Sequence, residues 1–104
     1  MRHSITARHC VIPKTLRVRA LAVLERLGNH ASRPVDGSVV FDTGPNRQTV
    51  EIRLHLATGT LFVATGDGSN HRSALDRAEE KLRRQLDKGV PRTRRTRGTA
   101  SGRA

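Results

Sequence analysis

The chain has 104 residues, in which 20 Lys and Arg face nine Asp and Glu, so its formal net charge is +11. This length predicts a single domain, and the excess of positive charge indicates an anionic partner, of which nucleic acid is the commonest. Phe41 and Phe62 are the only aromatic side chains. Proteins that stack single-stranded bases need more aromatic surface, so we expect binding through phosphates and shape.

The cysteine content and the apolar pattern indicate in which cellular compartment the protein works. Cys10 is the only cysteine, which excludes an internal disulfide framework and fits a reducing compartment. No apolar run approaches the ~20 residues of a membrane span, and residues 1–10 lack the apolar centre of a secretion signal. We therefore expect a cytoplasmic protein with no membrane contact.

The first half of the chain predicts a strand, a helix and a second strand. Apolar and polar residues alternate over residues 3–8, which is typical of a strand. Pro13 suits the start of a helix, and this helix is expected to run to about Leu27 and to stop at Gly28-Asn29. Residues 35–43 then predict the second strand.

The next segment predicts two more strands. Residues 49–57 alternate cleanly, so one face is expected to be buried and the other to meet water. Residues 60–65 follow after a tight turn, with Phe62 and Ala64 expected on the inner face. The Gly-Asp-Gly sequence of residues 66–68 is expected to break this strand.

Residues 69–88 predict a second helix with a narrow apolar stripe. Leu75, Ala78, Leu82 and Leu86 recur at spacings of three and four, which places them on one side. The rest of its surface carries six cations: Arg72, Arg77, Lys81, Arg83, Arg84 and Lys88.

The resulting order, β-α-β-β-β-α, predicts an α+β fold with a four-stranded mixed sheet and two helices packed on one face. A helix joins the first two strands, so these should be parallel with a right-handed crossover. The domain is expected to span residues 1–88. Residues 89–104 are basic and lack apolar periodicity, which predicts a tail that is disordered in isolation.

Both helices carry residues of a recognisable pattern. Ile5-Thr6 opens the first strand and Leu16-Arg17 the first helix. The second helix contains Ala74-Leu75-Asp76, Lys81-Leu82, Arg84-Gln85-Leu86 and Lys88. Together with the element order, these residues resemble the ribosome hibernation promoting factor family in its short form, which includes the ribosome-associated inhibitor A and was also described as sigma-factor modulation proteins. The resemblance covers about residues 3–88.

The resemblance implies a non-catalytic protein that occupies the mRNA and tRNA channel of the small ribosomal subunit and represses translation during stress or stationary phase. The small subunit and its rRNA are then the partner, and no cofactor or small-molecule substrate is expected. The basic positions that match the family are Arg17, Arg26, Lys81, Arg84 and Lys88. Neighbouring cations complete the predicted RNA-binding set: Arg77, Arg83 and, in the tail, Arg92.

The sequence departs from the family pattern in three places. His71-Arg72 stands where a Met-Tyr or similar pair is usual, and Val23 stands where a basic residue is common. No globular segment follows Lys88, so we expect no self-dimerisation domain.

Two other functions remain open from the sequence. A β-β-β-α order with basic residues is also found in double-stranded-RNA binders. A regulator that binds a transcription or stress factor through its sheet is the competing class. The salt dependence of binding distinguishes RNA binding from protein binding. Phosphate-driven binding falls steeply with added salt, whereas a contact between protein strands changes little.

Metal and enzyme sites are not expected. The five histidines and Cys10 lack tight ligand spacing, and no catalytic triad or carboxylate pair can be assembled. Some of the helix cations are expected to form structural pairs at helical spacing, Asp76 with Arg72 or Glu80 with Arg84.

Overall fold

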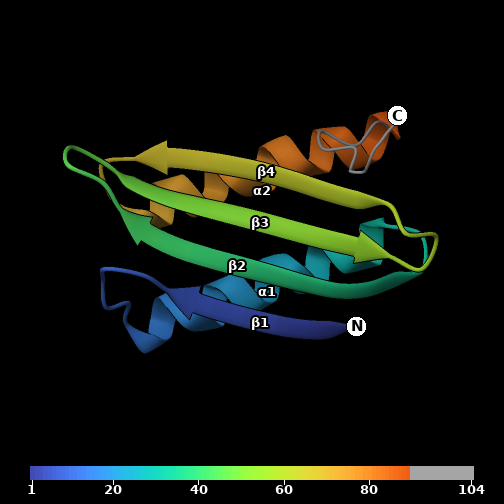
Figure 1. Cartoon of the computed structure of the whole chain (residues 1–104), viewed down its shortest axis with the longest axis horizontal. Coiled ribbons are helices and arrows are strands. Elements are labelled where there is room, and N and C mark those ends of the chain that lie inside the picture. Colours follow the sequence, from blue (N-terminus) through green and yellow to red (C-terminus); the bar gives the residue numbers. More distant parts are fainter. Residues whose placement is uncertain (90–104) are drawn as a thin grey trace.

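The computed structural model describes residues 1–89 and shows the elements in the predicted order (Figure 1). They are β1 (Arg2–Ala7), α1 (Lys14–His30), β2 (Pro34–Thr43), β3 (Gln48–Leu56), β4 (Leu61–Gly68) and α2 (His71–Lys88). The predicted α+β fold with a four-stranded mixed sheet and two helices is therefore confirmed. The predictions made for the tail concern residues outside the described part of the chain.

The sheet follows the chain in the order β1-β2-β3-β4. β1 and β2 are parallel, as the connecting helix requires. The other neighbouring pairs are antiparallel, and one row of partners crosses the whole sheet. In this row Ile5 lies opposite Val39, Val39 opposite Ile52, and Ile52 opposite Ala64. Since strand side chains alternate between faces, these apolar residues share one face.

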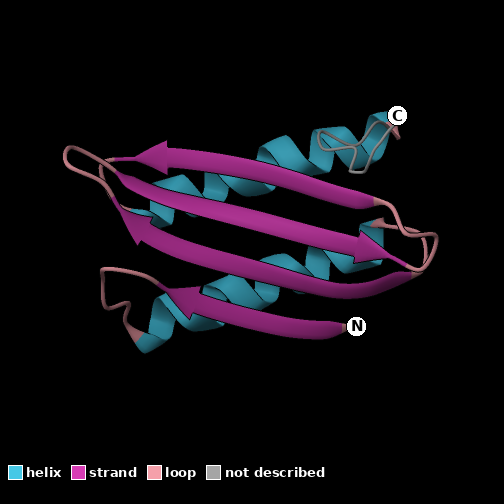
Figure 2. Ribbon diagram, viewed as in Figure 1, coloured by secondary structure: helices cyan, strands magenta, loops and turns pink. Residues whose placement is uncertain are grey.

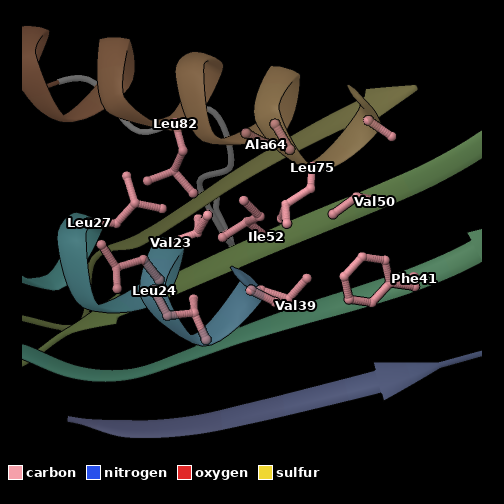
Figure 3. Packing of buried hydrophobic residues seen from close by; sticks show 14 of the residues in the cluster. Val23, Leu24, Leu27, Val39, Phe41, Val50, Ile52, Ala64, Leu75 and Leu82 are labelled. Carbon is pink, nitrogen blue, oxygen red and sulfur yellow. The ribbon is translucent and has the colours of Figure 1, made fainter. Parts of the chain in front are cut away.

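Both helices cover that face side by side (Figure 2). Apolar side chains of α1 and α2 meet those of the strands between the two layers (Figure 3). Among the described residues, no polar or charged residue belongs to the buried class. The core therefore consists of aliphatic side chains with two phenylalanines, and the charged residues are left at the surface.

The predicted end of α1 is wrong, because the helix passes through Gly28 and ends at His30. Gly28 is buried against the start of the chain. A Cβ atom built there would lie 2.7 Å from Cε of Met1, which is closer than real contacts. The Cε atom is the end of a flexible side chain, so Gly28 simply lies inside the helix next to Met1 and does not stop it.

The predicted end of β4 is also wrong, since Gly66 and the next two residues continue the strand. Gly66 lies directly beneath α2. A Cβ atom there would be 2.2 Å from the carbonyl oxygen of Ala74 and 2.6 Å from the amide nitrogen of Ala78. The glycine lets the helix approach the sheet, which is a reason for glycine inside a strand.

The limits of α2 have clear causes. The side chain of Asn70 accepts a hydrogen bond of 2.8 Å from the amide of Ser73 at the start of the helix. Gly89 ends it with a left-handed backbone, φ +68°. Of the predicted stripe, Leu75 and Leu82 are fully buried, whereas Leu86 packs at the edge of the core.

Candidate RNA-binding surface

Charge is distributed unequally between the two faces of the molecule. The two helices carry ten Lys and Arg against five Asp and Glu. The open face of the sheet, identified by the alternation of buried and exposed positions, carries four acids and two arginines: Asp36, Asp42, Glu51, Asp67, Arg2 and Arg53. The helix layer is thus the cationic side, and the sheet face is slightly acidic.

A row of ion pairs joins the two helices. Arg19 of α1 donates two hydrogen bonds to one carboxylate oxygen of Asp76 in α2, the shorter at 2.9 Å. His30 contacts Asp87 further along the same seam. Asp76 therefore pairs across the helices and not with Arg72 as the sequence suggested, while the expected pair of Glu80 with Arg84 is present within α2.

Arg26, one of the predicted RNA-binding residues, belongs to the same row. Its Nε and Nη2 atoms donate to the two carboxylate oxygens of Glu79 at 2.9 and 3.1 Å. These hydrogen bonds, together with the charges of Glu79 and Asp76, raise the pKa of Arg26 against the opposing effect of burial. The pair holds α1 against α2, so Arg26 is a structural residue in the free protein.

Two further predicted residues lie along the outer edge of β4. Arg77 Nη1 donates to the carbonyl oxygen of Asp67 at 2.7 Å, and Lys81 Nζ donates to that of Thr65 at 3.0 Å. One helical turn later, Gln85 Nε2 donates to the carbonyl of Val63 at 2.9 Å. We call Arg77, Lys81 and Gln85 the edge ladder. Their spacing of four matches every second carbonyl of the strand.

The remaining predicted residues of the described chain are exposed on the helices. Within residues 1–89, Arg17, Arg83 and Lys88 form no ion pair or side-chain hydrogen bond. Arg84 lies 3.5 Å from Glu80, but both side chains are more than 60% exposed, so solvent weakens this pair. These four residues are free to meet phosphates. The predicted Arg92 lies outside the described residues.

The predicted RNA-binding set did not include two exposed cations, Lys14 and Arg72, which lie in the first turns of the two helices. The helix starts share an open hollow of about 570 Å³ lined by Pro13, Thr15, Leu16, Arg19, Asn70, His71 and Arg72. The two helices run parallel, so both begin at the same end of the domain. That arrangement could have indicated that Lys14 and Arg72 lie close to each other's helix starts.

Two of the three departures from the family pattern have structural explanations. Val23 is fully buried between α1 and the sheet, so a phosphate contact there is not possible. His71 packs edge-on against Phe41, with ring centres 5.5 Å apart, and its Nε2 atom is 2.9 Å from the carbonyl oxygen of Asp42. It is an ordered part of the α2 start.

The histidines and the cysteine do not gather. Within residues 1–89 no group of three or more His, Cys, Asp and Glu side chains is arranged to hold a metal ion. Cys10 is half-buried. His55, on the open sheet face, lies 3.9 Å from Asp36. No helix of this part of the chain is both long and apolar enough to cross a membrane.

These features define the class, a small α+β domain with a cationic helix layer over a sheet with an acidic open face. The chain belongs to the family described as Sigma 54 modulation protein / S30EA ribosomal protein, which matches residues 3–94. It is a family of non-catalytic, ribosome-associated regulators of translation. The resemblance seen in the sequence is confirmed, and so is the expectation that this is no enzyme.

Solved structures share the fold. A ribosomal subunit interface protein from Coxiella burnetii superposes with a TM-score of 0.75 at 19% identity, covering 86% of this chain and 97% of that one. The N-terminal domain of Protein Y from Thermus thermophilus gives 0.73 at 22% identity, covering 86% and 99%. No curated protein matches the chain.

Proposed function

We propose that this protein works in the cytoplasm, where it occupies the mRNA and tRNA channel of the small ribosomal subunit and represses translation under stress. Its family supplies the ribosome as the partner. One protein of the same fold is described as a ribosomal subunit interface protein. The finer assignment, to rRNA in the small subunit, depends on the surface of this chain.

The observation that carries the proposal is the exposed cation group on the two helices. Arg17, Arg83, Arg84 and Lys88 are held on rigid helices and are not used by the core, the helix seam or the edge ladder. Phosphate contacts of this kind release counterions from the nucleic acid, which supplies sequence-independent affinity.

The helix cations that are already paired with acids also support the proposal. Arg19 and Arg26 hold the helix layer together through their acidic partners, so the surface that meets RNA is rigid. A rigid body blocks a channel without the entropy loss that a flexible segment suffers when it becomes ordered. Repression then follows from occupancy of the channel, and no chemical step is needed.

The test reverses two charges of the exposed group, Arg83→Glu with Arg84→Glu. Both side chains are exposed, and within residues 1–89 neither forms a hydrogen bond with the core or the edge ladder, so the fold is expected to persist. We expect binding to isolated small subunits, measured by pelleting, to weaken at least about tenfold, because two phosphate contacts become repulsions.

The matched control is Arg47→Glu with Arg53→Glu. It changes the net charge by the same amount, but Arg53 lies on the open sheet face and Arg47 in the turn before β3. We expect this variant to bind nearly as well as the unmodified protein. Equal weakening by both variants would mean that overall charge, and not the helix surface, determines binding.

A further inference from the structure

The two edges of the sheet differ in how their outward backbone groups are hydrogen-bonded. The outer carbonyls of β4 are satisfied by the edge ladder, whose donors come from α2. β1 is the opposite edge strand and, within residues 1–89, pairs only with β2. Unpaired strand edges are templates for pairing with another chain. In the part of the chain that the structure describes, one edge of the sheet is therefore protected and the other is open.

The register identifies the open groups of β1. Arg8 donates its amide to the carbonyl of Phe41, and Phe41 lies opposite Ala7. In a parallel pair, alternate residues turn both backbone groups toward the neighbouring strand, so those of residues 4 and 6 face β2. The N–H and C=O groups of His3, Ile5 and Ala7 then point outward. Within residues 1–89, none of them forms a hydrogen bond.

A flank of α1 continues this edge. Arg17, Leu21 and Gly28 lie along one line of the helix at spacings of four and seven, opposite the side on which Arg19 pairs with α2. Gly28 contacts Met1, the residue before β1, so this line faces the β1 side. Figure 1 shows α1 behind β1 and β2, with its first turn beyond the free edge of β1.

The open edge has one apolar and one polar side. On the helix side, a strand added next to β1 would meet Ile5 and the 39% exposed Leu21, with Arg17 beside them. On the open sheet face it would meet a row of polar residues that begins at Arg2. Arg8 follows the last residue of β1, and its side chain lies 3.4 Å from Asp42 but stays 60% exposed.

We propose that the free edge of β1 binds an extended segment of a protein partner in which apolar and acidic residues alternate. The backbone of the segment pairs with His3, Ile5 and Ala7, as in other cases of strand addition. Its apolar side chains cover Leu21, and its acidic side chains lie near the arginines. Apart from Arg17, this surface is separate from the exposed cation group, so Arg83, Arg84 and Lys88 of α2 can still meet RNA when the partner is bound.

A second copy of this chain fits the edge poorly. Antiparallel pairing of two β1 strands would bring Arg2 of one copy near Arg8 of the other, between molecules that each carry a formal charge of +11. Like charges placed opposite each other are destabilising. An acidic segment removes this repulsion.

The test uses the full chain labelled with ¹⁵N and an eight-residue peptide in which Val alternates with Glu. We expect peptide addition to shift the amide signals of His3, Ile5 and Ala7 and to slow their hydrogen exchange. The amides of Val63 and Thr65 at the other edge are the internal control and should not change. A peptide of the same length with Pro in place of the two central Val residues should not protect β1, because proline has no N–H group to donate to the strand.

The variant Ala7→Pro removes one outward N–H group and leaves the groups that pair with β2 in place, so an edge strand tolerates it. We expect it to weaken peptide binding at least about tenfold. Shifts confined to α1 and α2, equal binding of the proline peptide, or absence of protection at β1 in the unmodified protein would each overturn the proposal.

Discussion

The ammonium group of Lys81 donates a hydrogen bond of 3.0 Å to the backbone carbonyl of Thr65, on the outer edge of β4. A cation that the sequence assigns to RNA is thus used inside the free protein to close a strand edge. Natural sheets often place lysine at such edges. A variant of Lys81 that loses ribosome binding would therefore have two explanations, which only a stability measurement separates.

The variant Lys81→Met keeps most of the aliphatic stem and removes the donor. We expect the free energy of unfolding in urea to fall by about 0.5–1.5 kcal/mol and hydrogen exchange along β4 to become faster. Arg84→Met is the control, because the partner of Arg84, Glu80, is exposed. This substitution should lower the free energy of unfolding by less than about 0.5 kcal/mol. If both variants have the stability of the unmodified protein, the edge ladder does not stabilise β4.

Asp76 is expected to limit RNA binding, because it occupies the guanidinium of Arg19. Asp76→Asn should lower the free energy of unfolding by about 0.2–1 kcal/mol, as for other partly exposed pairs. The released Arg19 should bind RNA more tightly and steepen the salt dependence by about 0.9 in log K per log salt if it gains one phosphate contact. Titrations of small subunits at several salt concentrations measure this. An unchanged slope would mean that Arg19 lies away from RNA.

Gly66 is expected to tolerate no side chain. In Gly66→Ala the new methyl group would collide with the backbone of α2, which cannot rotate away as a flexible side chain can. We expect a loss of about 1–3 kcal/mol or more in thermal or urea unfolding. Gly44→Ala is the matched control, since its nearest atom is 3.5 Å away, and it should remain within about 0.5 kcal/mol. Comparable losses in both variants would contradict this packing.

Acid should weaken the contacts at the end of β1. Two hydrogen bonds lower the pKa of Asp42. The one with His9 has the larger effect, and the one from the amide of Thr43 adds to it. Because the folded pKa is the lower one, the stabilisation is present above the ordinary carboxyl value of about 4 and is lost as the pH falls through the folded pKa. In His9→Ala the pKa of Asp42 should rise toward the ordinary value in an NMR titration. An unchanged titration would show that His9 is not responsible.

Residue periodicity was enough to predict the fold, the parallel first pair of strands and the buried stripe of α2. It failed at Gly28, which lies inside α1 next to Met1, and at Gly66, where glycine lets α2 approach the sheet. The sequence alone does not show which of these roles a glycine has, because the atoms that it approaches belong to distant segments: Met1 in one case, Ala74 and Ala78 in the other.

The site was predicted less completely than the fold. Charge and the family pattern located the cationic helices, but they could not separate free cations from structural ones. Arg26, Arg77 and Lys81 find their partners 53, 10 and 16 residues away in the chain. Such partners depend on how α2 sits against α1 and β4, which only the folded structure reveals.

The most direct test of the central claim is sedimentation of the protein with purified ribosomes through sucrose gradients at low and high salt, with in vitro translation alongside. The account predicts migration with the small subunit at low salt, release at high salt because counterions compete for the phosphates, and repression of translation at concentrations that saturate binding. Protein that stays at the top of the gradient at low salt, or that binds without repressing translation, would contradict it.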